Sequence, residues 1–287
     1  MRDALRAELF KTLHRRMTYI LVAVLCLLVL AFYVILWLRL RGGPEAGVGG
    51  QLDYLAQREA MSFKNVVPYG LQLERFFLTL VCVVFTATMM GNEYDWRTVG
   101  VVVARGVKRW QFVAAKLVVS IGFAVMVLAA GFAVALLCSA WFSHLYHLPF
   151  GAFTVERVLD VFASLARTAY AVLPFVLMAL LFATIWRSAG QAVGFSLGFF
   201  FLEGVFTGLL ENAHGWLAHV PEALLNANAM AVMRANGLLS TNAQDRSPFA
   251  GAPGGVPVWR GFGVLLVYIA VFAAVAFWRF QHRDIQE

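Results

Sequence analysis

The sequence predicts an all-α polytopic membrane protein with six transmembrane helices, an N-terminal amphipathic interfacial helix and a short cytoplasmic helix. Of its 287 residues, 61% are hydrophobic and 14% are charged. Soluble domains carry roughly 45–50% apolar and about 25% charged residues. The apolar residues also gather into long runs, and a run of about 18 or more can cross a bilayer. Composition and pattern together exclude an ordinary soluble domain.

Six apolar runs are long enough to be spans, and residues 17–287 form one transmembrane domain behind a leading segment, 1–16. The predicted spans are 17–38, 71–90, 112–140, 161–186, 190–210 and 262–280. The third is long enough to tilt or to project beyond the bilayer. An even number of spans places both termini on one side, with the long connections 39–70 and 211–261 on the other. Helix-like stretches occur within these connections, at 52–61 and 222–239.

The distribution of Lys and Arg gives the orientation. Basic residues are dense in segments 1–16 and 91–116 and sparse in the two long connections. Dense positive charge marks the cytoplasmic face. We therefore expect both termini and the 91–116 segment to be cytoplasmic, and we attribute the net charge of +7 to span ends and phospholipid contact rather than to nucleic acid.

The leading segment predicts a basic amphipathic helix that lies in the cytoplasmic leaflet interface. Its less polar positions recur at helical spacing, opposite Arg6 and Lys11: Leu5, Leu9, Thr12 and Leu13. The alternative is positive charge that orients the first span and has no further role.

The segment 91–116 is a polar element between two apolar runs. Asn92 can cap a helix, and Glu93 and Asp95 would then fall in its first turn, where acidic groups suit the helix dipole. The pattern predicts a short helix over 92–104 that lies across the cytoplasmic mouth. The alternative is a well-anchored loop.

A turn and a second helix are predicted after this element. Gly106 permits a turn after Arg105, and residues 108–116 begin a helix that runs into the third span. Arg109 and Lys116 are expected to face lipid headgroups on that helix.

The fifth span has glycines four residues apart, which let helix backbones approach closely in lipid. The set comprises Gly190, Gly194, Gly198, Gly204 and Gly208. They predict close helix packing, either within one subunit or between two, or a face that borders a pathway.

Glu203 is the unusual residue of the fifth span, because an acid in hydrocarbon is costly unless it is paired or hydrated. It could face a water-filled exit or a cationic substrate. Alternatively, the span breaks near Gly204 and Glu203 lies at a wet outer mouth. Arg75 and Arg167 could pair with it, although Arg75 is expected to extend to the headgroups.

Two kinds of enzyme site are excluded. The sequence has no Gly-x-x-x-x-Gly-Lys-Ser/Thr loop to hold ATP phosphates. The Gly-x-Ser-x-Gly match at 194–198 falls within an apolar helix, whereas a nucleophile elbow needs a strand–turn–helix context. We expect no metal site, since the cysteines lack metal-ligand spacing and His144 and His147 would supply only two ligands.

Taken in order, the 91–116 segment resembles the cytoplasmic signature of ABC transporter permeases of the type-2 exporter class. The matching residues are Glu93, Thr98, Arg105, Gly106, Arg109 and Lys116. Arg97 stands where that family commonly has Gly, and Gly100 where it often has Arg. Residues 8–16, 186–190 and 277–285 resemble the family's start, its turn between the fourth and fifth spans and its tail.

The resemblance implies a permease subunit of the bacterial cytoplasmic (inner) membrane, without enzymatic activity or a cofactor of its own. Two ATPase subunits, which carry ATP and Mg, would dock on segment 91–111, and a second permease copy or paralogue would complete the pathway. The implied coupling residues are those of the match together with Asp95. A non-transporting scaffold, or an immunity or sensor protein, is the alternative.

Overall fold

The computed structural model describes residues 2–43, 48–98, 100, 108–148, 150–151, 154–210, 219–237 and 256–282. Within these ranges every element is a helix, and six helices are long and apolar enough to cross a membrane. The chain is therefore an all-α, multi-pass membrane protein, as predicted. The span helices are α2 (Arg16–Arg41), α4 (Leu71–Asp95), α6 (Arg109–Leu145), α7 (Val155–Trp186), α8 (Ala189–Leu210) and α11 (Val258–His282).

Several of these helices are longer than the apolar runs that predicted them. The 37 residues of α6 rise about 55 Å, which is well beyond the thickness of a hydrocarbon core. Helix α7 begins six residues before the predicted span because the Thr154 side chain accepts a hydrogen bond from the Arg157 amide and caps the helix. A polar capping residue outside the apolar run therefore sets the start of α7.

Two helices form the centre of the bundle. Helices α4 and α7 pack against each other and are largely buried, whereas α2, α8 and α11 expose most of their apolar side chains. Outward-facing apolar residues are what a lipid environment requires. The same packing places polar residues of α4 inside the bundle, where they need partners from neighbouring helices.

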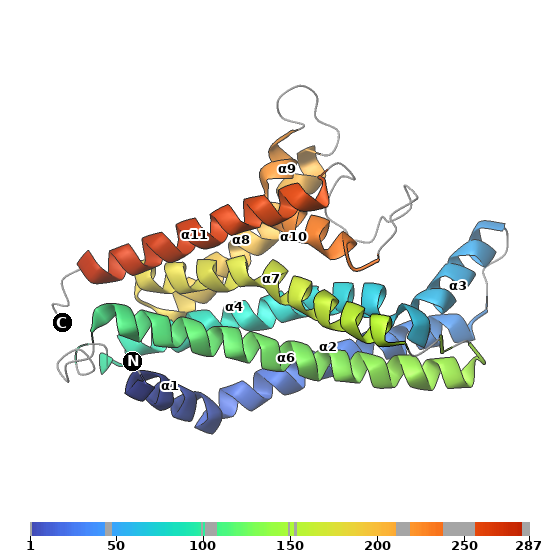
Figure 1. Cartoon of the computed structure of the whole chain (residues 1–287), viewed down its shortest axis with the longest axis horizontal. Helices are drawn as coiled ribbons and strands as arrows, with labels where there is room; N and C mark the ends of the chain where they lie inside the picture. The colour runs from blue at the N-terminus through green and yellow to red at the C-terminus, as the bar shows by residue number, and fades with distance from the viewer. Residues whose placement is uncertain are drawn as a thin grey trace.

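One end of the bundle gathers segments that are far apart in the sequence. Helix α1 (Arg2–His14) lies there with the end of α4, the start of α6, the turn between α7 and α8, and the end of α11 (Figure 1). We call this the α1 end. Away from it lie α3 (Val48–Ala60), α9 (Val220–Ala223) and α10 (Leu225–Arg234), which confirm the predicted helical stretches in the long connections.

Candidate functional site

Helix α1 presents a polar face to the bundle. Glu8 and Thr12 are buried, while Leu9, Phe10 and Leu13 are exposed. The backbone at Arg15 is extended and turns the chain into α2. The predicted helix is confirmed, and its exposed apolar side chains suit a membrane interface. Thr12, however, faces the bundle rather than lying with Leu9 and Leu13.

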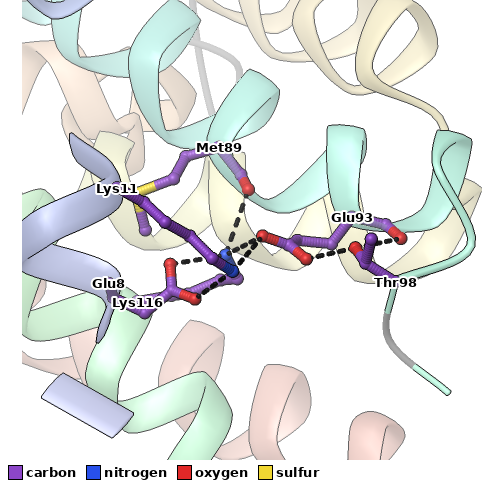
Figure 2. Close-up of polar contacts among 6 residues, drawn as sticks. All are labelled: Glu8, Lys11, Met89, Glu93, Thr98 and Lys116. Carbon is purple, nitrogen blue, oxygen red and sulfur yellow. Dashed lines mark hydrogen bonds and ion pairs between the residues drawn. The ribbon is translucent and has the colours of Figure 1, made fainter. Parts of the chain in front are cut away.

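Four charged side chains from three helices meet at the α1 end (Figure 2). The Lys116 amino group lies 2.9 Å from a Glu8 oxygen and 3.1 Å from a Glu93 oxygen. The Lys11 amino group lies 3.2 Å from Glu8 and 3.3 Å from Glu93. Each lysine therefore contacts both glutamates, and the charges cancel. We call these four residues the charge cluster; it joins α1, α4 and α6.

The expectation that Lys116 faces lipid headgroups was wrong. The side chain is fully buried, and its amino group also donates to the Met89 carbonyl oxygen. A buried ammonium group is tolerated only with such partners, because its desolvation is costly. The sequence could not reveal this arrangement, because Glu8 is separated from Lys116 by 108 positions.

Lys11 is the more exposed lysine of the cluster. Burial alone would lower the pKa of its ammonium group, but the carboxylates of Glu8 and Glu93 outweigh burial and raise the pKa. Lys11 therefore remains charged throughout the neutral range. Helical spacing places Lys11 opposite the less polar positions of α1, and no pattern in the sequence marks Glu8 as its partner.

The predicted start of a helix at Asn92 was also wrong. Residues 92–95 continue α4, and the Asn92 carbonyl accepts a hydrogen bond from the Trp96 amide in the last turn. Glu93 and Asp95 thus occupy the end of a long helix rather than the first turn of a new one. The apolar run had ended at 90, but α4 continues because Glu93 finds partners on α1 and α6.

Asp95 reaches a different helix from Glu93. Its carboxylate accepts a hydrogen bond from the backbone amide of Ala189, 3.1 Å away, at the first position of α8. An acidic group at a helix N-terminus satisfies a free amide and interacts favourably with the helix dipole. The end of α4 is therefore attached to α1 and α6 through Glu93, and to α8 through Asp95.

Gly91 allows this close contact between α4 and α8. A Cβ atom added at Gly91 would lie 2.4 Å from the Cα and 2.6 Å from the backbone nitrogen of Ala189. Only a residue without a side chain fits at that distance from another backbone. Gly91 was not among the predicted site residues, and the only signal in the sequence is a small residue at the end of a span.

The remaining predicted coupling residues lie around this contact. The Thr98 hydroxyl donates to the Glu93 side chain and main chain, and the Arg109 guanidinium donates to the Gln281 carbonyl at the end of α11. Arg97 has a φ of 56°, a left-handed conformation that favours glycine. Arg105 and Gly106 lie outside the described residues, as do residues 99 and 101–104 of the predicted helix over 92–104.

Helix α8 has two different faces. A buried stripe of Ala192, Ser196, Phe200, Glu203 and Thr207 faces the bundle. The glycines lie elsewhere: a Cβ atom at Gly190, Gly194, Gly198 or Gly204 would meet no atom within 4 Å. Within the described ranges, these four glycines therefore make no close packing contact. The surroundings of Gly208 are outside the described part.

Glu203 stabilises a helix from the long connection. Its carboxylate accepts a hydrogen bond from the backbone amide of Asn226, in the first turn of α10, where Leu224 supplies no capping side chain. Helix α8 continues through Gly204, and Glu203 is 3% exposed, so the alternative of a broken span with a wet mouth was wrong. Glu203 acts as the missing cap of α10.

The two arginines considered as partners of Glu203 behave differently. Arg75 is 1% exposed and donates to the Asn226 side chain and to the Met230 sulfur, so it does not extend to the headgroups. Its charge nevertheless acts on Glu203. Arg167 donates to the Ala235 carbonyl and the Asn236 side chain, beyond the C-terminal end of α10. Both ends of α10 are thus attached to span helices.

Comparison with known proteins gives a family without an assigned activity. No curated protein matches the chain. A family model described as "Protein of unknown function (DUF2705)" matches residues 50–286, which cover α4, α6, α8 and the other span helices except α2. The chain therefore belongs to the DUF2705 family.

Proposed function

We propose that this chain is the membrane-spanning permease subunit of an ATP-driven exporter. The segment 92–110 would receive the movement of a separate ATPase chain, with ATP and Mg held by that partner. The proposal places the α1 end in the cytoplasm, as the distribution of Lys and Arg suggests. It is supported by the order of the signature residues and by the contacts made at the end of α4.

The observation that carries the proposal is the arrangement of Glu93 and Asp95. They are two residues apart, yet Glu93 binds Lys11 and Lys116 while Asp95 binds the α8 amide of Ala189. A load applied just after α4 would therefore act on α1, α6 and α8 together. A loop that only connects two spans has no need of such attachments.

An ATPase can drive these helices only if it binds their two arrangements with different free energy. The contacts at the α1 end can separate two such arrangements of the helices, because these contacts are short-range and buried. A small displacement of the α4 end keeps the ion pairs and moves the partner helices with it. A larger displacement breaks the ion pairs and costs free energy. Two discrete arrangements are favoured over continuous bending.

A second permease copy fits the open face of α8. Among the residues that the structure describes, none lies within 4 Å of a Cβ atom added at Gly190, Gly194 or Gly198, and Phe195, next to Gly194, is exposed. Small residues four apart favour close helix pairing in lipid. In the proposed dimer, the glycine face lies at the interface or beside the pathway, while Glu203 stays on the bundle side.

The decisive experiment is purification of the tagged chain from its native membrane under mild conditions. We expect a nucleotide-binding ATPase to co-purify and its hydrolysis rate to depend on the chain. Glu93→Gln should retain the ATPase but reduce that dependence, whereas Lys64→Met, at an exposed position outside the α1 end, should behave as wild type. Purification of the intact chain without any ATPase would favour the non-transporting scaffold.

A further inference from the structure

The first turn of α4 carries a carboxyl group that none of the contacts above uses. Glu74 is 0% exposed and lies among α2, α4 and α6. Gly131 of α6 makes room for it: a Cβ atom at Gly131 would lie 2.4 Å from a Glu74 oxygen and 2.5 Å from a Leu25 methyl carbon. The carboxyl group therefore occupies the space that a side chain at Gly131 would fill.

Neither oxygen of Glu74 has a hydrogen-bond partner among the described residues. The backbone amide of Phe132 lies near the carboxyl group, but α6 already uses that amide in its own helical hydrogen bond. Arg75, the next residue, reaches Asn226 and Met230 instead. Phe132 and Arg75 therefore supply Glu74 with neither an opposite charge nor a free hydrogen-bond donor.

The ionisable groups of α2 and α6 that face Glu74 are neutral at neutral pH. Helix α2 contributes the Cys26 thiol and the Tyr33 phenol, and Tyr33 is hydrogen-bonded to Ser139 of α6 at 3.0 Å. Cys138 of α6 lies beside Tyr33. On the α8 and α10 side of α4, Arg75 and Glu203 interact with each other and with Asn226. No described lysine, arginine or histidine forms an ion pair with Glu74.

Two other buried acids, Glu93 and Glu203, have partners of a kind that Glu74 lacks. Glu93 contacts two ammonium groups, and Glu203 accepts a hydrogen bond from α10 and feels the charge of Arg75. Opposite charge stabilises the ionised form of Glu93, and Glu203 has an amide donor for one of its two oxygens. Glu74 has neither among the described residues, and burial in an apolar interior without partners strongly disfavours the ionised form of a carboxyl group.

We propose that Glu74 is a proton-binding site: its carboxyl group holds a proton at neutral pH while the contact among α2, α4 and α6 is closed. The ligand is the proton itself. An arrangement that opens this contact to water lets the carboxyl group ionise, so a rise in pH favours the open arrangement by mass action. This inference does not depend on an ATPase partner.

The test is infrared difference spectroscopy on the full chain in lipid at neutral pH. The spectrum of wild type minus Glu74→Gln should contain the carbonyl stretch of one protonated carboxylic acid. The matched control is Glu222→Gln, which removes a carboxylate paired with Arg260 and should lose only carboxylate bands. Loss of carboxylate bands from Glu74→Gln, with no acid carbonyl band, would overturn the proposal.

A second variant protects the test against misfolding. Glu74→Leu replaces a neutral acid in an apolar site with an apolar side chain of similar size, so it should fold at least as well as wild type. Its difference spectrum should show the same acid band without the amide band that glutamine adds. Failure of both variants to fold would also overturn the proposal, because a protonated, unpartnered carboxyl group is not needed for stability.

Discussion

The amino group of Lys116 lies 2.9 Å from the carboxylate of Glu8, and neither side chain is more than 6% exposed. This pair joins the first helix of the chain to the helix that begins at Arg109. Glu93 lies on the other side of the same amino group. An interfacial helix that the sequence had linked only to lipid is therefore fixed to the end of α4 by buried charge.

Replacement of Lys116 by Met should destabilise the protein by about 3–5 kcal/mol, because it leaves Glu8 and Glu93 buried with only Lys11 between them. Lys64→Met, at an exposed position, should have little effect. Thermal unfolding in detergent measures both. In a cycle with Glu8→Gln, the two changes should be far from additive. Additive effects would mean that the pair contributes no coupling.

Gly91→Ala should force α4 and α8 apart, because the new Cβ atom would lie 2.4 Å from the Ala189 Cα. We expect a loss of about 1–3 kcal/mol, as for overpacking in a core. Gly122→Ala in α6 is the matched control, since its Cβ atom meets nothing within 4 Å. The control should be neutral or more stable by up to about 1 kcal/mol. Equal stability of the two variants would contradict the close contact.

Asp95→Ala should free the backbone amide of Ala189 and cost about 1 kcal/mol, as the loss of a helix cap does. Hydrogen exchange at the start of α8 should become faster, while exchange in the middle of α8 is unchanged. Asp95→Asn keeps an acceptor and should restore much of the protection. Unchanged exchange in Asp95→Ala would show that the cap is not formed in the membrane.

The ion pair between Glu222 and Arg260 should make stability depend on pH in the acid range. The hydrogen bond from Arg260, at 2.7 Å, lowers the pKa of Glu222 below its ordinary value of 4.5. A lowered pKa in the folded state means that the stabilisation is complete above about pH 4.5 and is lost as pH falls through the folded value. The difference in thermal stability between wild type and Glu222→Gln should shrink over that range. A difference in thermal stability that stays constant with pH would exclude this contribution of the Glu222–Arg260 ion pair.

Elements that depend on local pattern could be predicted from the sequence. Six apolar runs became six span helices, and the leading segment became a helix, because apolar length and helical spacing are local properties. The left-handed conformation of Arg97 was not predicted, because the pattern placed this residue inside a helix over 92–104. Helix ends were less predictable, since α4 passes its apolar run to reach Asp95.

The sequence by itself determined that this protein crosses a membrane, and it marked Glu93, Lys116 and Glu203 as residues to explain. Only the tertiary structure decided what they do. Glu8 meets Lys116, Asp95 caps α8, Glu203 caps α10, and Glu74 forms no ion pair within the described part of the chain. The reason is physical: a buried charge is tolerated according to the groups within a few ångströms of it, and helix packing, not sequence spacing, brings those groups together.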